Sequence, residues 1–358
     1  MTPALSSAPV GMCSSVHSHE YFQIPIAEVV QETDSAVSLI LDVPSSLADT
    51  FQYKPGQFLT LRVPIDGKMR QRCYSLASAP GIDTRHKIAI KRVEGGMVSN
   101  HVCSSLKAGD IVEVQPPAGL FVPASLDTDF LLFAGGSGIT PVLSILKAAL
   151  SHGRGHVTLL YANRDEQSVI FRDEISALST AHPERLTVLH WLESLQGLPT
   201  VAQIAGLVRP WANAQAFICG PEPFMAGVSS ALQALGVDDK CVHLERFVSL
   251  PDEDVADAAV AAMAEQSVDS ELKVSIDGGE HVIAWSRNVK MLDAMLEAGI
   301  DAPYSCRVGG CSACMCKVLS GRVRMAANLV LDDNEIAEGW VLGCQSFPET
   351  DHVSIEIP

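Results

Sequence analysis

The chain has 358 residues, of which 47% are hydrophobic and only 19% are charged. This composition excludes a disordered protein and favours more than one globular domain. The 42 acidic and 25 basic residues give a net charge of −17, which excludes nucleic acid and anionic membranes as expected partners and favours a basic face on another protein. No apolar run is long enough to span a membrane and no secretory signal pattern is present, so we expect a cytoplasmic location.

Short strands with alternating side chains are expected in the first part of the chain. After a flexible tail at residues 1–20, apolar and polar residues alternate in 57–63, 87–93 and 111–115, with Pro and Gly between these stretches. Alternation at a period of two is typical of strands that are buried on one face. The pattern predicts an antiparallel β-barrel domain over residues 21–125.

Residues 126–250 have a different pattern, in which continuous apolar strands alternate with helical stretches. The predicted strands are 130–134, 157–163, 186–192 and 216–220. Strands that are apolar on both faces indicate a parallel sheet covered by helices. This architecture is typical of a nucleotide-binding α/β domain.

The last part of the chain is predicted to be a small separate domain. Residues 251–270 are rich in Ala and acidic side chains and poor in large apolar ones, which is typical of a linker. From residue 271 to residue 358 the chain begins and ends with alternating strand patterns. These limits predict a compact third domain.

Two segments of the first domain have the residue types that a flavin dinucleotide requires. Arg72 offers a cation for a pyrophosphate, Tyr74 a ring to cover the isoalloxazine, and Ser75 a hydrogen-bonding group near flavin N5. Residues 95–100 (GGMVSN) lead from two glycines into a helix start, where backbone amides and a serine suit phosphate oxygens. Taken singly, each segment is also compatible with an ordinary strand or a capped turn.

The second domain has two turns that suit a nicotinamide nucleotide. Strand 130–134 leads into GGSGITP, in which glycines admit a pyrophosphate, Thr140 suits a helix N-cap and Pro141 the first helical turn. The run is not a G-x-G-x-x-G fingerprint, because Pro141 replaces the last glycine. A later strand ends at Cys219, and ligands bind at the carboxyl ends of parallel strands. A buried cysteine before a turn is the alternative for Cys219.

Four cysteines of the third domain have the spacing of an iron–sulfur motif. Cys306, Cys311 and Cys314 follow C-x4-C-x2-C, and Cys344 comes 29 residues later, as in plant-type [2Fe-2S] ferredoxins. Small residues between them would let backbone amides approach the sulfides. Structural zinc usually takes two close cysteine pairs, and a redox dithiol needs no fourth cysteine. The extra thiol, Cys316, is expected to be a buried packing residue.

Together and in this order, these motifs resemble the ferredoxin-NAD(P)H reductase family with a plant-type ferredoxin domain fused at the C-terminus. The resemblance covers nearly all of the chain after residue 20. It implies a multi-domain protein with an antiparallel β-barrel FAD domain, an α/β parallel-sheet NAD domain and an α+β β-grasp [2Fe-2S] domain. The implied cofactors are FAD, a [2Fe-2S] cluster and NADH or NADPH.

The same resemblance assigns the site residues. Those assigned to the flavin are Arg72, Cys73, Tyr74, Ser75, Gly96, Met97, Val98, Ser99 and Phe247. Those assigned to the nicotinamide nucleotide are Gly136, Ser137, Gly138, Thr140, Gly220 and Pro221, with Ser75 and Cys219 as catalytic residues. The cluster ligands are Cys306, Cys311, Cys314 and Cys344. Ser312 departs from the pattern, because many members of the family have glycine there.

Residues 161–171, 186–200 and 216–225 are similar to the reductase components of 3-ketosteroid 9α-hydroxylase, a Rieske oxygenase, and next to phenylacetyl-CoA oxygenase reductases. The implied function is electron transfer from NADH through FAD and the cluster to a terminal oxygenase. A flavin is needed between NADH and the cluster because a hydride carries two electrons and the cluster accepts one.

Two alternatives remain open. NADPH would be the donor if Arg164 and Arg172 paired with a 2′-phosphate, although Asp165 and Glu166 beside them favour NADH. A non-catalytic iron–sulfur carrier would use the first two domains only as a scaffold.

Overall fold

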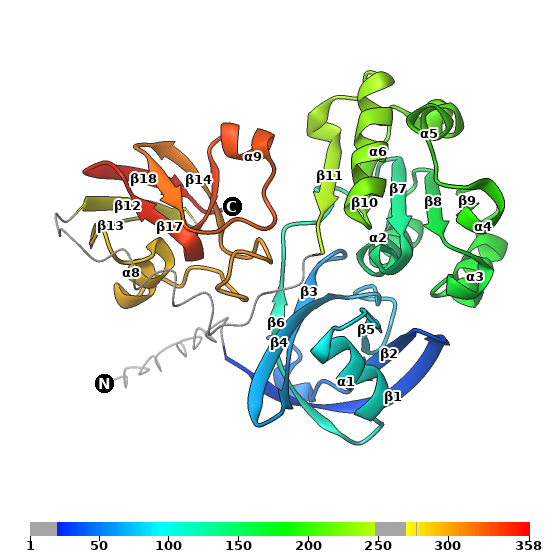
Figure 1. The fold of residues 1–358 in the computed structure, drawn as a ribbon, viewed down its shortest axis with the longest axis horizontal. Coiled ribbons are helices and arrows are strands. Elements are labelled where there is room, and N and C mark those ends of the chain that lie inside the picture. The colour runs from blue at the N-terminus through cyan, green and yellow to red at the C-terminus, as the bar shows by residue number, and fades with distance from the viewer. Residues whose placement is uncertain (1–19, 248–269, 277) are drawn as a thin grey trace, which may run out of the picture.

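The computed structural model of the protein describes residues 20–247, 270–276 and 278–358. Three large sheets, one in each of three domains, organise the described chain, with the first sheet at the bottom of Figure 1, the second at the upper right and the third at the upper left. The tail predicted at 1–20 and the linker predicted at 251–270 lie outside the described residues, apart from Glu20 and Ser270.

The first sheet is antiparallel and has six strands in the order β4-β3-β6-β1-β2-β5. Its strands are β1 (Phe22–Thr33), β2 (Ala36–Leu41), β3 (Phe58–Ile65), β4 (Lys68–Ser75), β5 (His86–Lys91) and β6 (Ile111–Ala118), and α1 (Met97–Ser105) packs beside them. An isolated bridge between Leu76 and Ile88 joins the end of β4 to β5. The barrel-type fold predicted from the alternating pattern is therefore confirmed.

Strand β3 explains both the success and the limit of the alternating pattern. Leu59, Leu61 and Val63 are buried in the barrel core, as the pattern predicts. Thr60 points to the other face, yet it is only 1% exposed. Its hydroxyl forms a hydrogen bond with Ser305 of the third domain. A polar outer face of the barrel is therefore covered by another domain.

The second sheet is parallel and has five strands in the order β11-β10-β7-β8-β9. They are β7 (Phe130–Gly135), β8 (Val157–Asn163), β9 (Leu186–Leu192), β10 (Gln215–Cys219) and β11 (Val242–Glu245). The helices are α2 (Ile139–His152), α3 (Arg172–Ala181), α4 (Glu193–Gln196), α5 (Val201–Val208) and α6 (Glu222–Ala234). Within β7, Leu132 packs toward α2 and α3 whereas Leu131 packs toward α5 and α6. This burial on both faces is the reason for the continuous apolar strands.

The third domain has a mixed sheet in the order β13-β12-β18-β14-β16 and a small pair of β15 and β17. The strands are β12 (Ser270–Ile276), β13 (Gly279–Trp285), β14 (Met315–Ser320), β15 (Val323–Met325), β16 (Trp340–Leu342), β17 (Ser346–Pro348) and β18 (His352–Glu356). The helices are α8 (Met291–Glu297) and α9 (Asp333–Ala337). Strands β12 and β18 pair in parallel, and α8 contributes to one core with them. The predicted α+β class is confirmed.

The first and second domains are joined by a buried network of charges. Lys147 of α2 is 5% exposed and lies 2.6 Å from both Asp83 and Glu174. Glu174 also accepts a 2.5 Å hydrogen bond from Lys87 of β5. Because the buried ammonium of Lys147 has carboxylate partners from both domains, the network fixes the barrel against the α/β domain. Among the described helices, none is long and apolar enough to cross a membrane.

Candidate functional site

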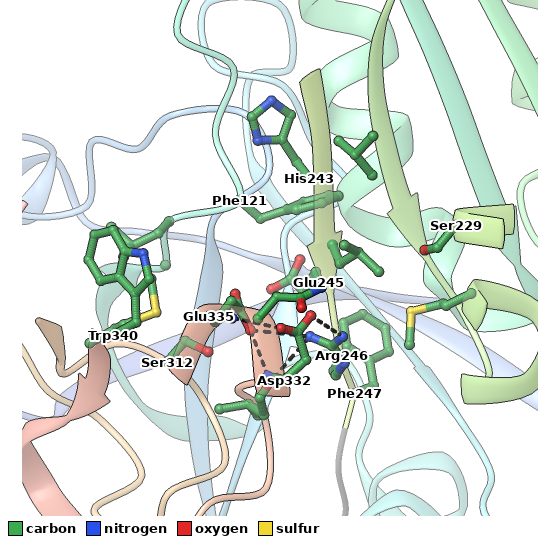
Figure 2. Close-up of a pocket in the computed structure, with 18 of the residues that line it drawn as sticks. Phe121, Ser229, His243, Glu245, Arg246, Phe247, Ser312, Asp332, Glu335 and Trp340 are labelled. Carbon is green, nitrogen blue, oxygen red and sulfur yellow. Dashed lines mark hydrogen bonds and ion pairs between the residues drawn. The ribbon is translucent and has the colours of Figure 1, made fainter. Parts of the chain in front are cut away.

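A cavity of about 840 Å³ lies where the three domains meet. Figure 2 shows Glu245, Arg246 and Phe247, which come from the end of β11, beside Asp332 and Glu335 of the third domain. The predicted site residues that line this cavity are Arg72, Cys73, Ser75, Phe247 and Cys311. Residues predicted separately for a flavin and for a cluster therefore share one space.

The side chains of the flavin motif at the end of β4 lie in two places, some at the cavity and one against the barrel core. Arg72, Cys73 and Ser75 line the cavity, and Arg72 Nη1 donates a hydrogen bond to the carbonyl of Gln71 at 2.7 Å. Tyr74 packs against the barrel core instead, and burial raises its pKa. Phe247 also lines the cavity and is 46% exposed, which suits an aromatic ring that covers a ligand.

The predicted glycine turn of the barrel domain forms the start of α1. Gly95 has φ of +70°, and Gly96 is the N-cap residue of the helix. Ser99 Oγ accepts a 3.2 Å hydrogen bond from the amide of Val93, and a Cβ on Gly96 would lie 2.7 Å from that oxygen. Val98 is buried and Met97 is exposed. The turn therefore keeps a helix start with free backbone amides, as an anion site requires.

The predicted N-cap of α2 is wrong. The cap residue is Gly138, because Gly136–Gly138 form a 3-10 turn that continues directly into the helix. Thr140 therefore lies inside the first helical turn, where its hydroxyl donates a 3.1 Å hydrogen bond to the carbonyl of Ser137. Pro141 lies in the first turn, as predicted. The glycines still present their amides at a helix start.

The two predicted nicotinamide turns are brought together because β7 and β10 are neighbours in the sheet. A Cβ on Gly138 would lie 2.2 Å from the carbonyl oxygen of Cys219, and one on Gly220 would lie 2.9 Å from Cα of Gly135. The two turns therefore touch through their backbones. Cys219 is fully buried beside them, and burial raises the pKa of its thiol well above the usual range.

Sequence reasoning missed Glu245, which is paired in register with Cys219. Its Oε2 is buried without a hydrogen-bond partner, and burial raises the pKa of the carboxyl to about 8. The signal in the sequence is an acid at the end of the last strand of this domain, two residues before Phe247. A carboxyl that keeps its proton at neutral pH beside a cysteine is typical of a functional site.

Glu245 makes stability depend on pH. Below pH 4.5, which is the ordinary pKa of a glutamate carboxyl, Glu245 is protonated in both the folded and the unfolded state. As the pH rises from there to about 8, the unfolded carboxyl ionises first, so the folded state loses stability, and the loss is complete above 8. We expect Glu245→Gln to raise the melting temperature of the protein at pH 9 and to leave it nearly unchanged at pH 5, as measured by circular dichroism. The exposed Glu184→Gln controls for the lost charge, and equal shifts at both pH values would contradict the assignment.

Lys91 is a second residue that sequence reasoning missed. A Cβ on Gly136 would lie 3.3 Å from Lys91 Nζ, so this lysine of β5 reaches across to the glycine turn of the second domain. Burial, and then the neighbouring Arg164, lower the pKa of Lys91. A cation at the start of a helix suits phosphate oxygens. Its sequence signal is hidden, because the contact depends on how two domains pack.

The four predicted ligand cysteines lie in two pairs. The amide of Cys344 lies 3.5 Å from Cys314 Sγ, and the amide of Cys306 lies 3.4 Å from Cys311 Sγ. A hydrogen bond with Cys314 lowers the pKa of Cys344, and a hydrogen bond with Cys311, followed by burial, raises the pKa of Cys306. Among the described residues, no three His, Cys, Asp or Glu side chains are grouped so that they could hold a single metal ion. Two thiol pairs instead match a two-iron cluster, in which each iron takes two thiolates and two sulfides.

The backbone around the cysteines also suits a cluster. The amide of Gly310 points to Cys306 Sγ at 3.3 Å, and the amide of Cys344 points to Cys314 Sγ at 3.5 Å. Ser312 has φ of +55°, in the left-handed region that glycine adopts most easily. This explains physically why glycine is favoured at that position. Amides directed at sulfur stabilise a negatively charged cluster, so these residues fit the [2Fe-2S] group.

Residues 305–314, which contain the first three ligand cysteines and are called the cluster loop below, contact strand β4 and its flavin motif directly. Gln71 Nε2 donates a 3.2 Å hydrogen bond to the carbonyl of Cys306, and Cys73 packs with Cys306 and Cys311 in one apolar group. Cys316, two residues beyond the third ligand, is buried and donates to Met291 Sδ at 3.7 Å. Strand β4 therefore carries the flavin motif and contacts the cluster loop.

Comparison with known families assigns each domain. Residues 23–122 match the oxidoreductase FAD-binding domain, residues 132–230 the oxidoreductase NAD-binding domain and residues 274–349 the 2Fe-2S iron-sulfur cluster binding domain. FAD and a [2Fe-2S] cluster are therefore the cofactors of the protein.

Three known proteins are similar over nearly the whole chain. The "3-ketosteroid-9-alpha-monooxygenase, ferredoxin reductase component" of Rhodococcus rhodochrous is 49% identical, covering 95% of this chain and 98% of that one. A component of the 1,2-phenylacetyl-CoA epoxidase of Escherichia coli strain K12 is 35% identical, covering 94% and 97%. The structure of phthalate dioxygenase reductase shares the fold, with a TM-score of 0.58 and 24% identity over 94% and 98% of the chains. The chain therefore belongs to the family of FAD- and NAD-binding reductases with a C-terminal 2Fe-2S ferredoxin domain, and it is an NAD(P)H-dependent flavin and iron–sulfur oxidoreductase.

Proposed function

We propose that the protein is the reductase component of a two-component oxygenase, which passes electrons from NADH through FAD and the [2Fe-2S] cluster to a terminal oxygenase. The observation that carries the proposal is the shared cavity, in which Cys311 lies with Arg72 and Ser75. A cluster that lines the same space as a flavin motif has a short route for electrons.

The residues would divide the work as follows. When bound, FAD supplies two-electron chemistry with a nicotinamide and one-electron chemistry with a cluster. The guanidinium of Arg72 would bind the pyrophosphate, because its N–H donors match phosphate oxygens. The hydroxyl of Ser75, which is buried at the end of β4, would orient the reactive edge of the flavin ring. Cys306, Cys311, Cys314 and Cys344 would hold the cluster.

The second domain would position the nicotinamide. The turns at Gly138 and Gly220 pack backbone against backbone at the strand ends. The nicotinamide would bind at this edge of the sheet, and Cys219 would line its position. Glu245 would hold a proton on its carboxyl at neutral pH, since its pKa is about 8. Phe247 would cover the flavin and exclude water until the nicotinamide replaces it.

NADH is the proposed donor. Asp165 follows β8 and uses its side chain to cap the next turn through Ser168, so a carboxylate is fixed at the carboxyl end of that strand. A carboxylate near this edge favours a ribose hydroxyl over a phosphate. Arg172 is paired with its neighbour Asp173 at 3.2 Å, which reduces its ability to bind a 2′-phosphate.

Stopped-flow absorbance with NADH and with NADPH tests this proposal. We expect NADH to bleach the flavin at least about ten times faster than NADPH, as a missing charge pair typically costs, and cluster reduction to follow. Faster bleaching by NADPH would overturn the choice of donor. Flavin reduction without any cluster reduction would overturn the electron route.

For the partner we propose a terminal oxygenase that acts on a 3-ketosteroid, supported by the 49% identity to the steroid monooxygenase component against 35% to the phenylacetyl-CoA one. None of the nine cysteines in the described part of the chain forms a disulfide, which supports the cytoplasm as its location. Steroid hydroxylation should be measured with the oxygenase component of the Rhodococcus rhodochrous system, NADH and this protein. Epoxidation of phenylacetyl-CoA with the corresponding Escherichia coli oxygenase, faster than steroid hydroxylation, would contradict the choice.

A further inference from the structure

Arg246 extends from the second domain into the third. It directly follows β11, and its side chain is only 16% exposed. Its Nη1 donates a 3.1 Å hydrogen bond to the carbonyl of Val330, and its Nη2 donates one to Asp332 Oδ2, also at 3.1 Å. Glu335 Oε2 lies 3.6 Å from Nη1. A single guanidinium therefore joins the two domains through a carbonyl and two carboxylates (Figure 2).

The surface that receives Arg246 is already rigid. Asp332 caps α9 with its Oδ1, which accepts a 2.8 Å hydrogen bond from the amide of Glu335, while Glu335 accepts one from the amide of Asp332. Asn328 holds the preceding turn through hydrogen bonds with Val330 and Leu331. Because Asp332 uses one oxygen for the cap and the other for Arg246, the guanidinium binds a group that is already oriented.

This surface is connected to the cluster loop. The amide of Leu329 donates a 3.1 Å hydrogen bond to the carbonyl of Gly309, which lies between Cys306 and Cys311. A Cβ on Gly309, which has φ of +78°, would lie 3.1 Å from the carbonyl oxygen of Ala327. The turn at 327–332 therefore contacts the cluster loop directly through its backbone, so a displacement of this turn would also displace the loop.

We propose that Arg246 is a positioning residue for electron transfer, which holds the third domain so that the cluster loop stays against the flavin motif. This inference rests on the proposed function. The contacts between the cluster loop and the barrel include two hydrogen bonds between neutral groups, from Gln71 to Cys306 and between Thr60 and Ser305, and the packing of Cys73 with the loop cysteines. Arg246 adds a partly buried ionic contact. Removing one partner of such a contact costs free energy because the other charge is left without a partner.

If Arg246 positions the third domain, its replacement slows reduction of the cluster but not reduction of the flavin by NADH. A general loss of structure would slow both rates. In Arg246→Met, we expect NADH to bleach the flavin within about two-fold of the parent rate and the cluster to be reduced roughly ten-fold more slowly, because a lost buried charge pair weakens the docked arrangement. Arg246→Lys should recover part of the second rate. Asp332→Asn, which changes the other domain, should give the same division between the two rates.

The matched control is Arg154→Met. Arg154 is also an arginine of the second domain, but it is 87% exposed and pairs with Asp127 at 2.5 Å within that domain, so both rates should stay at the parent values. Small-angle X-ray scattering on the oxidised holoprotein gives a readout that is independent of turnover. The radius of gyration should increase in Arg246→Met and Asp332→Asn and not in the control.

The outcomes distinguish the two proposals. If the parent protein fails to pass electrons from flavin to cluster, the proposed function fails. If the parent passes them and both Arg246→Met and Asp332→Asn keep the parent rate of cluster reduction and the parent radius of gyration, the positioning role is overturned. Equal slowing of both rates in a folded variant would also overturn it.

Discussion

Replacing Cys314 with serine is expected to abolish electron output while the flavin still accepts electrons from NADH. Cys314 is buried in a pair with Cys344, and a serine oxygen is a poor substitute for a thiolate as a ligand of iron. Iron and acid-labile sulfide should fall to the background of the analysis. Reduction of cytochrome c should fall roughly a hundred-fold or more, since the cluster is lost rather than adjusted, whereas NADH should bleach the flavin at the parent rate.

Cys316→Ala is the matched control for this variant. Cys316 lies two residues beyond Cys314 and is also buried, and its thiol donates to Met291 Sδ at 3.7 Å. We expect full iron content and a loss of about 1 kcal/mol in the free energy of unfolding, which is typical of a small core truncation. Loss of iron in this control, or its retention in Cys314→Ser, would contradict the ligand assignment.

The second large effect is expected for Gly138→Ala. The added Cβ would lie 2.2 Å from the carbonyl oxygen of Cys219, a distance that forces β7 and β10 apart at the predicted nicotinamide position. Overpacking of this kind costs about 1–3 kcal/mol of stability. A displacement of about 1 Å at a hydride-transfer site slows the reaction by about a hundred-fold. Stopped-flow bleaching of the flavin by NADH measures this loss.

Dithionite should reduce the flavin of Gly138→Ala at the parent rate, because it needs no nicotinamide position. Gly206→Ala in α5 controls for the glycine change, since no atom lies within 4 Å of its added Cβ. There we expect unchanged NADH reduction and a gain of about 0.5–1 kcal/mol, as for an exposed helical glycine. Parent-like bleaching by NADH in Gly138→Ala would show that the two turns do not form the nicotinamide position.

The two domain interfaces are built from different physical contacts. Lys147 joins the first and second domains with a buried ammonium between two carboxylates, and the apolar core of the α/β domain continues into Ala36 and Phe121 of the barrel domain. The described contacts of the third domain with the others include the ionic contact of Arg246, neutral hydrogen bonds and the packing of Cys73 with the cluster loop. These contacts hold the flavin and nicotinamide halves of the site as one unit, onto which the cluster domain docks.

Local sequence patterns predicted the elements because each pattern reflects a local physical constraint. The alternation in 57–63 predicted β3, and the continuous apolar runs predicted β7 and β8, since burial on one or two faces sets these periods. The same reasoning failed at Thr140. A 3-10 turn extends the helix start by the length of that turn, and a preference for N-cap residues carries no information about it.

The sequence by itself determined the three-domain order and the [2Fe-2S] motif, because these follow from periodicity and from cysteine spacing. It indicated FAD and a nicotinamide nucleotide through the resemblance of its motifs, taken in order, to a known family. Tertiary structure decided which side chains share the site. Tyr74 packs against the barrel core, whereas Glu245 and Lys91 became part of the site only through the packing of the domains. Arg246 likewise contacts the third domain only in the folded protein. Such contacts join residues that are far apart in the chain, and the buried environment that raises the pKa of Glu245 exists only after the domains have packed.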